Sequence, residues 1–384
     1  MNFIFVVERY NDLDMISPII WKCSECNNAN VVIVNAWPKY LSSSDFRIAF
    51  LKKNPSVKYI EIPQTFNDIS RYIFSRLRLN WFHKKFLNSL FSPSQKNFDR
   101  IPIDRSLPTM VMVSYTTHPV AKNAMIWAEK NKFIKVFHDH GVHPFVYFPD
   151  EKKVTDPGTT INSFNLYILN NKQSFKNKFN FDDKLVSKIY SSARFSKEWS
   201  NKLSEICPKI KLNLEKNKFK IVFMLSKWKD KDDMKLILSA IRAASEIEDT
   251  EIIVKPHTRG MNFNFSMPSN VLVVEENVHS RQLIEESSVV VFTRSGIFLD
   301  AVLLDKPVIH MSYTTSVELT SKSLNECRVY NQNDFISKLL MIKIKGRNYS
   351  PTDRNKCLDF YAGPNHDGNM LNDIINKLKK ESIN

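Results

Sequence analysis

The chain has 384 residues, of which 43% are hydrophobic and 25% charged, and its formal net charge is +15 at pH 7. The length predicts two domains, and the composition is typical of a soluble globular protein. Only seven glycines are present, with no G-x-G-x-x-G and no Walker loop, which excludes the usual dinucleotide-binding and P-loop classes.

The excess of basic residues favours polyanionic partners, which are nucleic acid, an anionic membrane face or phosphorylated substrates. No run of eighteen apolar residues occurs, and the chain opens on a strand, so we expect a cytoplasmic protein without a transmembrane helix or cleaved signal. Five scattered cysteines predict no disulfide framework. Cys23 and Cys26 lack a second pair at zinc spacing, and we predict no metal site.

The first half of the chain alternates apolar runs with helical patterns, as in a parallel sheet covered by helices. The expected strands are 2–7, 31–34, 57–62, 109–114, 133–137 and 164–169, the last of them closing the first domain. The expected helices are 14–26, 46–53, 119–130 and 179–208.

Two polar segments follow strands of this half. Glu8 and Asp12 lie in a turn after the first strand. The segment from His138 to His143 places three imidazoles and a carboxylate at another strand end, and His140 beside Asp139 is the candidate general base. A metal site needs a further ligand that the sequence does not identify, and the alternative is that these histidines only hydrogen-bond their loop.

Residues 69–91 interleave aromatic and aliphatic side chains with arginine and lysine. A basic amphipathic helix of this kind can lie on an anionic bilayer, which predicts peripheral attachment to the inner face of the membrane. The alternative is a core-packed helix with a solvated basic face.

The second half repeats the alternation of strands and helices. Strands are expected at 219–225, 251–254, 271–274, 287–292 and 306–310, with helices at 233–247, 297–304 and 334–342. We therefore predict an α/β protein of two Rossmann-like, doubly wound domains facing a cleft. The predicted ranges are an acceptor domain at 1–208, a linker at 209–218 and a donor domain at 219–384, which includes a final helix.

Three strand ends of the second half carry basic or hydroxyl side chains. Ligands of such sheets bind outside the carboxyl ends of the strands, where hydroxyls, guanidinium groups and a helix N-terminus suit a phosphate. Taken together, the side chains at these three strand ends predict a nucleotide-phosphate site. Each loop alone is typical of a helix cap with solvated charges. The residues are Ser226, Lys227, Lys255, His257, Arg259, Thr293, Arg294, Ser295 and Gly296.

The order of these motifs resembles that of GT-B glycosyltransferases, in particular bacterial CDP-glycerol glycerophosphotransferases and the transferases that build capsules and other surface polysaccharides. The resemblance spans about residues 109–380. It rests on His140-Gly141, Lys255-Pro256-His257, the segment 293–301 with Lys306-Pro307, and Asp367-Gly368.

The resemblance implies a nucleotide-activated donor, of CMP/CDP or UDP type, bound by the second domain and a glycan or lipid-linked acceptor bound by the first. It makes His140 the base, places Lys255, His257 and Ser295 at the donor phosphates, and brings Asp300 to a ribose hydroxyl. The sequence departs from the family at Thr258, where proline is usual, and at Arg294, where serine is usual. These departures leave the donor and the stereochemical outcome open.

Three functions remain to be weighed. The first is a glycosyltransferase or polyol-phosphate transferase of surface-glycan assembly that uses neither metal nor cofactor, with His140 oriented by Asp139 and with Glu8 or Asp12 as further candidates for the base. The second is a non-hydrolysing nucleotide-sugar 2-epimerase, in which acidic residues move the proton. The third is a basic nucleic-acid-binding protein, which the absence of a recognisable module disfavours.

Overall fold

The computed structural model divides the chain into two compact units. Unit 1 comprises residues 1–141, 154–199 and 365–384, and unit 2 comprises residues 142–153 and 200–364. These ranges differ from the predicted ones mainly because the C-terminal residues belong with unit 1. The described residues are 1–8, 10–36, 45–62, 95–114, 119–139, 145–146, 164–170, 187–226, 233–257, 265–275, 277–315, 318–364, 366 and 368–382.

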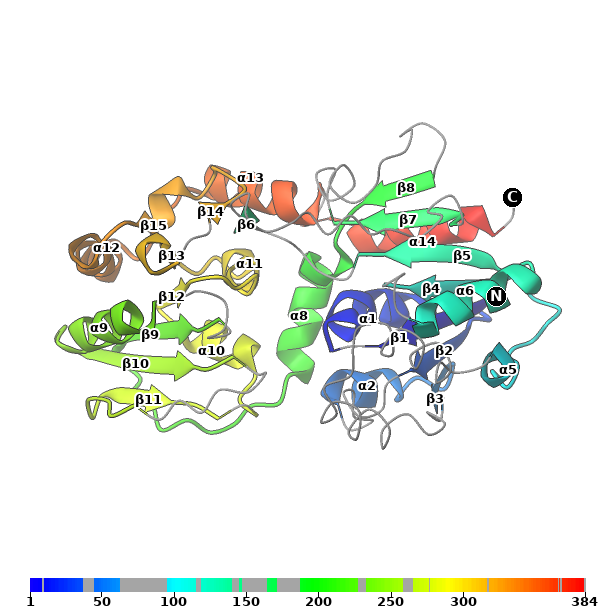
Figure 1. Ribbon diagram of the computed structural model, residues 1–384, viewed down its shortest axis with the longest axis horizontal. Coiled ribbons are helices and arrows are strands. Elements are labelled where there is room, and N and C mark those ends of the chain that lie inside the picture. The colour runs from blue at the N-terminus through cyan, green and yellow to red at the C-terminus, as the bar shows by residue number, and fades with distance from the viewer. Residues whose placement is uncertain are drawn as a thin grey trace, which may run out of the picture. The chain divides into compact units, whose positions relative to one another are not determined.

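The sheet of unit 1 is built from the described strands β1 (Asn2–Val7), β2 (Asn30–Asn35), β3 (Val57–Glu61), β4 (Thr109–Val113), β5 (Ile134–His138), β7 (Leu166–Leu169) and β8 (Ser187–Tyr190). Their order is β3-β2-β1-β4-β5-β7-β8, and all pairs are parallel (Figure 1). Residues 3–7 are buried throughout, which a parallel sheet covered by helices requires. The strand order reverses between β1 and β4, the topological switch point of this sheet.

The described helices of unit 1 come from the first 130 residues and from the C-terminal part of the chain. They are α1 (Tyr10–Ser24), α2 (Phe46–Leu51), α5 (Gln95–Phe98), α6 (Pro119–Lys130) and α14 (Met370–Glu381). α14 packs against α1, so the red and blue helices of Figure 1 are neighbours although they stand far apart in sequence. α14 buries one apolar stripe, made of Met370, Leu371, Ile374, Ile375 and Leu378.

The structure corrects three expectations for unit 1. α1 begins at Tyr10, so Asp12 lies in its first turn and not in a loop. The strand 164–169 is not the last, because β8 follows it at the edge of the sheet. The helix predicted over 179–208 is wrong at 187–196, where β8 and a 3-10 turn at Ala193–Phe195 lie, and it is confirmed only at α8 (Lys197–Ile206). The membrane-binding helix predicted at 69–91 lies outside the described residues.

The main sheet of unit 2 contains the described strands β9 (Phe219–Met224), β10 (Thr250–Lys255), β11 (Val271–Val273), β12 (Val289–Phe292), β13 (Val308–Met311) and β15 (Arg328–Val329). Their order is β11-β10-β9-β12-β13-β15, again all parallel (Figure 1). The switch point of this sheet therefore lies between β9 and β12. A small antiparallel ribbon pairs β14 (Glu318–Leu319) with β6 (Phe145–Val146).

The described helices of unit 2 are α9 (Met234–Ser245), α10 (Ser280–Glu286), α11 (Phe298–Leu303), α12 (Gln332–Lys345) and α13 (Pro351–Ala362). α9 and α12 pack together over a core that includes Phe223, Val291 and Phe335. α12 ends at Gly346, whose φ of 74° is a left-handed conformation that glycine adopts without strain. None of the described helices is long and apolar enough to span a membrane.

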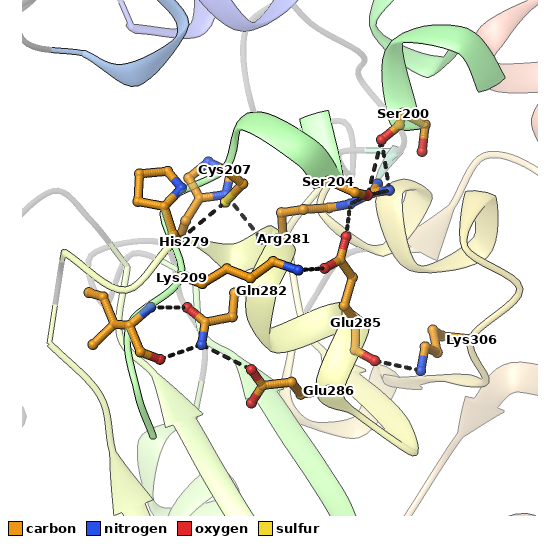
Figure 2. A network of polar contacts seen from close by, with 12 residues as sticks. Ser200, Ser204, Cys207, Lys209, His279, Arg281, Gln282, Glu285, Glu286 and Lys306 are labelled. Carbon is orange, nitrogen blue, oxygen red and sulfur yellow. Dashed lines mark hydrogen bonds and ion pairs between the residues drawn. The ribbon is translucent and has the colours of Figure 1, made fainter. Parts of the chain in front are cut away.

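A polar network fastens α10 to the segment that enters unit 2 (Figure 2). The buried Arg281 guanidinium donates to Ser204 Oγ at 2.6 Å and to Glu285 Oε1 at 2.9 Å. Gln282 pairs with the backbone of Ile210, donating to its carbonyl at 2.6 Å and accepting from its N–H at 2.9 Å. The side-chain amide of Gln282 thus pairs with both backbone polar groups of Ile210, as a neighbouring strand would. These bonds hold the segment after α8 in place although it forms no strand.

Candidate functional site at the carboxyl edge of the unit 2 sheet

Two hydroxyl side chains meet across the switch point of unit 2. Ser226 follows β9 and Thr293 follows β12, and their oxygens lie 2.6 Å apart. Ser226 Oγ also accepts from the backbone N–H of Arg294 at 2.8 Å. Ser226 is 6% exposed and Thr293 1% exposed, so this pair is enclosed within the fold. It joins the two central strands and sets the direction in which the chain leaves β12.

The turn from Thr293 to Gly296 leads into α11 and leaves its backbone accessible. Ser295 Oγ accepts from Ile297 N at 3.4 Å, and the Gly296 carbonyl accepts from Leu299 N at 3.1 Å. Arg294, Ser295 and Gly296 are all partly exposed, and a Cβ at Gly296 would meet no atom within 4 Å. α11 spans only Phe298–Leu303, so its N-terminus alone does not make an anion site, and the side chains beside it are needed as well.

Two basic side chains stand at the neighbouring strand end. Lys255 is the last residue of β10 and is only 4% exposed, whereas His257 is partly exposed two residues later. Leu225 N donates to the Lys255 carbonyl at 3.1 Å, which holds the ends of β9 and β10 together. The structure therefore brings Lys255, His257 and Ser226 to one edge, as the sequence predicted. Lys227 and Arg259 lie outside the described residues.

Asp300, the predicted ribose contact, lies inside α11 and is 5% exposed. Its backbone N–H donates to Ile297 O at 3.0 Å, and its carbonyl accepts from Leu304 N at 3.1 Å. The backbone of Asp300 thus belongs to the helix, and the role of its carboxylate stays a prediction.

His310, at the same edge, was missed by the sequence reasoning. It pairs with Phe292 across β13 and β12, and the two rings stack with centroids 5.1 Å apart. Its Nδ1 lies 3.1 Å from Ser312 Oγ. Burial, aided by the charge of Arg328, lowers the pKa of His310 to about 3, so the ring is neutral at physiological pH. Its one sequence signal was a polar residue at the end of an apolar strand.

The corresponding edge of unit 1 carries the carboxylates that the sequence singled out. Glu8 Oε1 accepts from Ala121 N at 2.9 Å in the first turn of α6. Asp12 Oδ2 accepts from the Glu8 N–H at 3.1 Å. Glu8 and Asp12 are 3% and 0% exposed, so both side chains organise backbone amides at the switch point between β1 and β4.

Asp139 directly follows β5 and is fully buried. Its Oδ2 accepts from Asn170 N at 3.1 Å, and its own N–H donates to Ile168 O at 3.0 Å. These bonds fix Asp139 between the ends of β5 and β7. His140, which it was expected to orient, lies outside the described residues, so their pairing stays a prediction.

Comparison with known proteins gives the fold. No family model matches the chain, and neither does any curated protein sequence. Among solved structures, UDP-GlcNAc 2-epimerase from Methanocaldococcus jannaschii is 12% identical, with a TM-score of 0.55 over 99% of this chain and 100% of that one. S. aureus MnaA, solved with UDP, is 13% identical, with a TM-score of 0.58 over 98% of this chain and 96% of that one.

The glycotransferase of kitacinnamycin is also similar, at 11% identity and a TM-score of 0.54 over 98% of this chain and 99% of that one. These matches cover both units, and they confirm the predicted class, an α/β protein with two Rossmann-like domains of the GT-B type. At such identities the likeness shows the fold alone. The narrower resemblance to CDP-glycerol glycerophosphotransferases stays a prediction.

Proposed function

We propose that the protein is an enzyme that acts on a nucleotide sugar and binds its diphosphate at the carboxyl edge of the unit 2 sheet. The observation that carries this proposal is the Ser226–Thr293 pair at the switch point, with Lys255 and His257 on the adjacent strand end. Ligands of doubly wound sheets bind at such a point.

The chemistry of this edge suits a pyrophosphate. The cations of Lys255 and Arg294 offset its negative charge, and the accessible backbone at Gly296 allows close approach of phosphate oxygens. The S. aureus structure, which contains UDP, supports a uridine nucleotide as the first one to test.

The first candidate reaction is 2-epimerisation of a UDP-sugar, which the name of the similar Methanocaldococcus jannaschii protein favours. In this reaction a base takes the proton from C2 of the sugar while the C1–O bond to UDP breaks, so that the electron pair forms a C1=C2 double bond. UDP then adds back to C1 as an acid gives a proton to the opposite face of C2. Asp139 and His140 are our candidates for these proton transfers.

The second candidate is transfer of the sugar to an acceptor hydroxyl of a glycan. The specific observation in its favour is that Glu8 and Asp12 already bond backbone amides, which leaves fewer carboxylates for two proton transfers. His140 would then deprotonate the acceptor, and Lys255, His257 and Arg294 would stabilise the departing nucleoside diphosphate in place of a metal. A surface glycan as acceptor and attachment to the inner membrane face through 69–91 belong to this candidate.

Calorimetric titration with UDP, CDP, GDP and CMP tests the binding proposal. We expect micromolar binding of one nucleotide, lost in Lys255→Met and in His257→Ala. Lys345→Ala is the control for Lys255→Met, because it removes one positive charge from an exposed position at the end of α12. Absence of binding to every nucleotide, or equal binding by all variants, would refute the site.

The two reactions separate in deuterated water without an acceptor. An epimerase exchanges the C2 proton of UDP-N-acetylglucosamine with solvent and produces a second isomer, both visible by proton NMR. A transferase leaves that proton in place whether or not an acceptor is present. A bound nucleotide sugar whose C2 proton never exchanges would exclude 2-epimerisation of that sugar.

A further inference from the structure

Two hydroxyl groups beyond β13 have no hydrogen-bond partner in the part of the chain that the structure describes. They belong to Tyr313, in the 3-10 turn Ser312–Thr314, and to Thr315, the next residue after that turn. Both oxygens are enclosed, although each residue as a whole is partly exposed. Most enclosed hydroxyls in folded proteins are paired, so two unpaired ones within three residues call for a physical reason.

The strand register places these two residues at the edge that carries the proposed nucleotide site. Phe292 pairs with His310 across the parallel strands β12 and β13. Tyr313 and Ser295 each lie three residues beyond this pair, so both stand past the carboxyl ends of neighbouring strands. Thr315 follows two residues later.

The backbone around the two hydroxyls is well anchored. Asp233 N donates to Thr314 O at 2.8 Å, and Thr314 Oγ1 donates to Met311 O at 2.9 Å. The Tyr313 ring packs against the core cluster between α9 and the sheet. Because the ring and the turn are held from several sides, the missing partner does not result from a loosely attached segment.

Other buried tyrosines of unit 2 show what a structural hydroxyl looks like here. Tyr349 donates to Lys306 O at 2.6 Å, at the opposite end of β13, and the Tyr361 oxygen accepts from Ser321 N at 2.9 Å. Burial raises the pKa of Tyr313 to about 12, so its hydroxyl keeps its proton at neutral pH and is a donor. An oxygen-rich ligand is the partner that such a donor lacks.

We propose that the hydroxyls of Tyr313 and Thr315 belong to the nucleotide-sugar site and donate hydrogen bonds to phosphate or sugar oxygens of the ligand. This inference rests on the proposed function and extends the site from β9, β10 and β12 to the end of β13. Under this proposal the two hydroxyls serve ligand binding, and leaving them unpaired lowers the stability of the ligand-free protein.

The test uses the isosteric variants Tyr313→Phe and Thr315→Val, titrated with UDP and with UDP-N-acetylglucosamine and melted without ligand. We expect each variant to bind about threefold to tenfold more weakly, the effect of one hydrogen bond. Without ligand, Tyr313→Phe should melt about 2–4 °C above the wild type, because an unpaired enclosed hydroxyl has been removed. The matched control Tyr349→Phe should melt below the wild type and bind both ligands normally.

The outcomes separate this inference from the proposed function. Weaker binding of both ligands places the hydroxyls at the diphosphate, and weaker binding of UDP-N-acetylglucosamine alone places them at the sugar. If the wild type binds and the variants bind equally well, the hydroxyls meet only water and the inference is wrong, while the proposed function stands. If the wild type binds neither ligand nor any other nucleotide, both proposals fail.

Discussion

Ser226 and Thr293 are 67 residues apart in the chain, yet their side-chain oxygens lie 2.6 Å from each other and so join the ends of β9 and β12. The same Ser226 oxygen receives the N–H of Arg294. One hydroxyl thus fixes both the end of β12 and the first residue of the turn that carries Arg294 and Ser295. The pair therefore holds in place the turn that we propose binds the diphosphate.

We expect Ser226→Ala to lower the free energy of unfolding by about 1–3 kcal/mol, because the enclosed Thr293 hydroxyl and Arg294 N–H lose their partner. Nucleotide affinity should fall with it, since the turn is no longer held. Denaturant unfolding and calorimetry measure the two effects. Ser239→Ala is the control, because it removes a hydroxyl that bonds Gln332 between α9 and α12 at 2.8 Å, and it should leave nucleotide affinity unchanged.

Lys255 and Arg294 should respond differently to salt. Lys255 is 4% exposed and Arg294 partly exposed, and enclosed charges are screened less than exposed ones. Lys255→Met should therefore weaken nucleotide binding about 10–100-fold at both low and high sodium chloride, the effect of a hydrogen bond to a charged group. Arg294→Met should weaken it mainly at low salt. Equal salt dependence of nucleotide binding in the two variants would contradict the expected difference between the enclosed Lys255 and the partly exposed Arg294.

Asp139 and Glu8 are both buried carboxylates that accept a backbone N–H, yet we expect their amide variants to differ. Asp139→Asn should lower turnover about 10²–10⁴-fold, the contribution of a general acid or base, because Asp139 adjoins His140. Glu8→Gln should keep turnover, because an amide oxygen can still accept the Ala121 N–H. Both variants should melt near the wild type. Loss of turnover in Glu8→Gln would move the acid–base role to the switch point of unit 1.

Because of His310, we expect the folded protein to lose stability in acid. Its pKa is lowered to about 3 in the folded protein, below the ordinary value of 6.5, so the unfolded chain takes up the proton first. The contribution of the neutral ring is complete above pH 6.5 and is lost as the pH falls from there toward 3, by up to about 1.4 kcal/mol per pH unit. Melting from pH 7 to pH 4 should show a shallower decline in His310→Asn. An equal decline would show that other groups control acid unfolding.

The parallel sheets were the most predictable part of the fold. Strands such as β1, β10 and β12 each contain a short apolar run that is followed by polar residues, so the run and its end signal agree. β8 escaped prediction because its four residues, all half-buried at the sheet edge, include a serine and a lysine and carry no apolar run. The local sequence pattern does not show which strand will lie at the edge of a sheet.

The candidate site was predictable where several residues cluster in sequence and hidden where partners are distant. Lys255, His257 and Thr293 to Gly296 follow predicted strands, so topology alone brings them to one edge. The bond between Ser226 and Thr293, the stacking of His310 and the unpaired Tyr313 hydroxyl depend on the register between strands, which the sequence does not display. The bond from Ala121 N to Glu8, which joins the first turn of α6 to the end of β1, likewise has no local signature in the sequence.

The return of α14 to unit 1 has a consequence for how the protein is made. The sheet of unit 1 is synthesised by residue 199, but the helix that covers α1 begins at Met370. At about 5–20 residues per second the ribosome needs roughly 10–35 s for the intervening stretch. During that time α1 lacks the apolar stripe that covers it, while unit 2 can already assemble. The opening domain therefore exposes an apolar face of α1 until the last helix is made, and shortening the C-terminus would damage the part of the protein that is translated first.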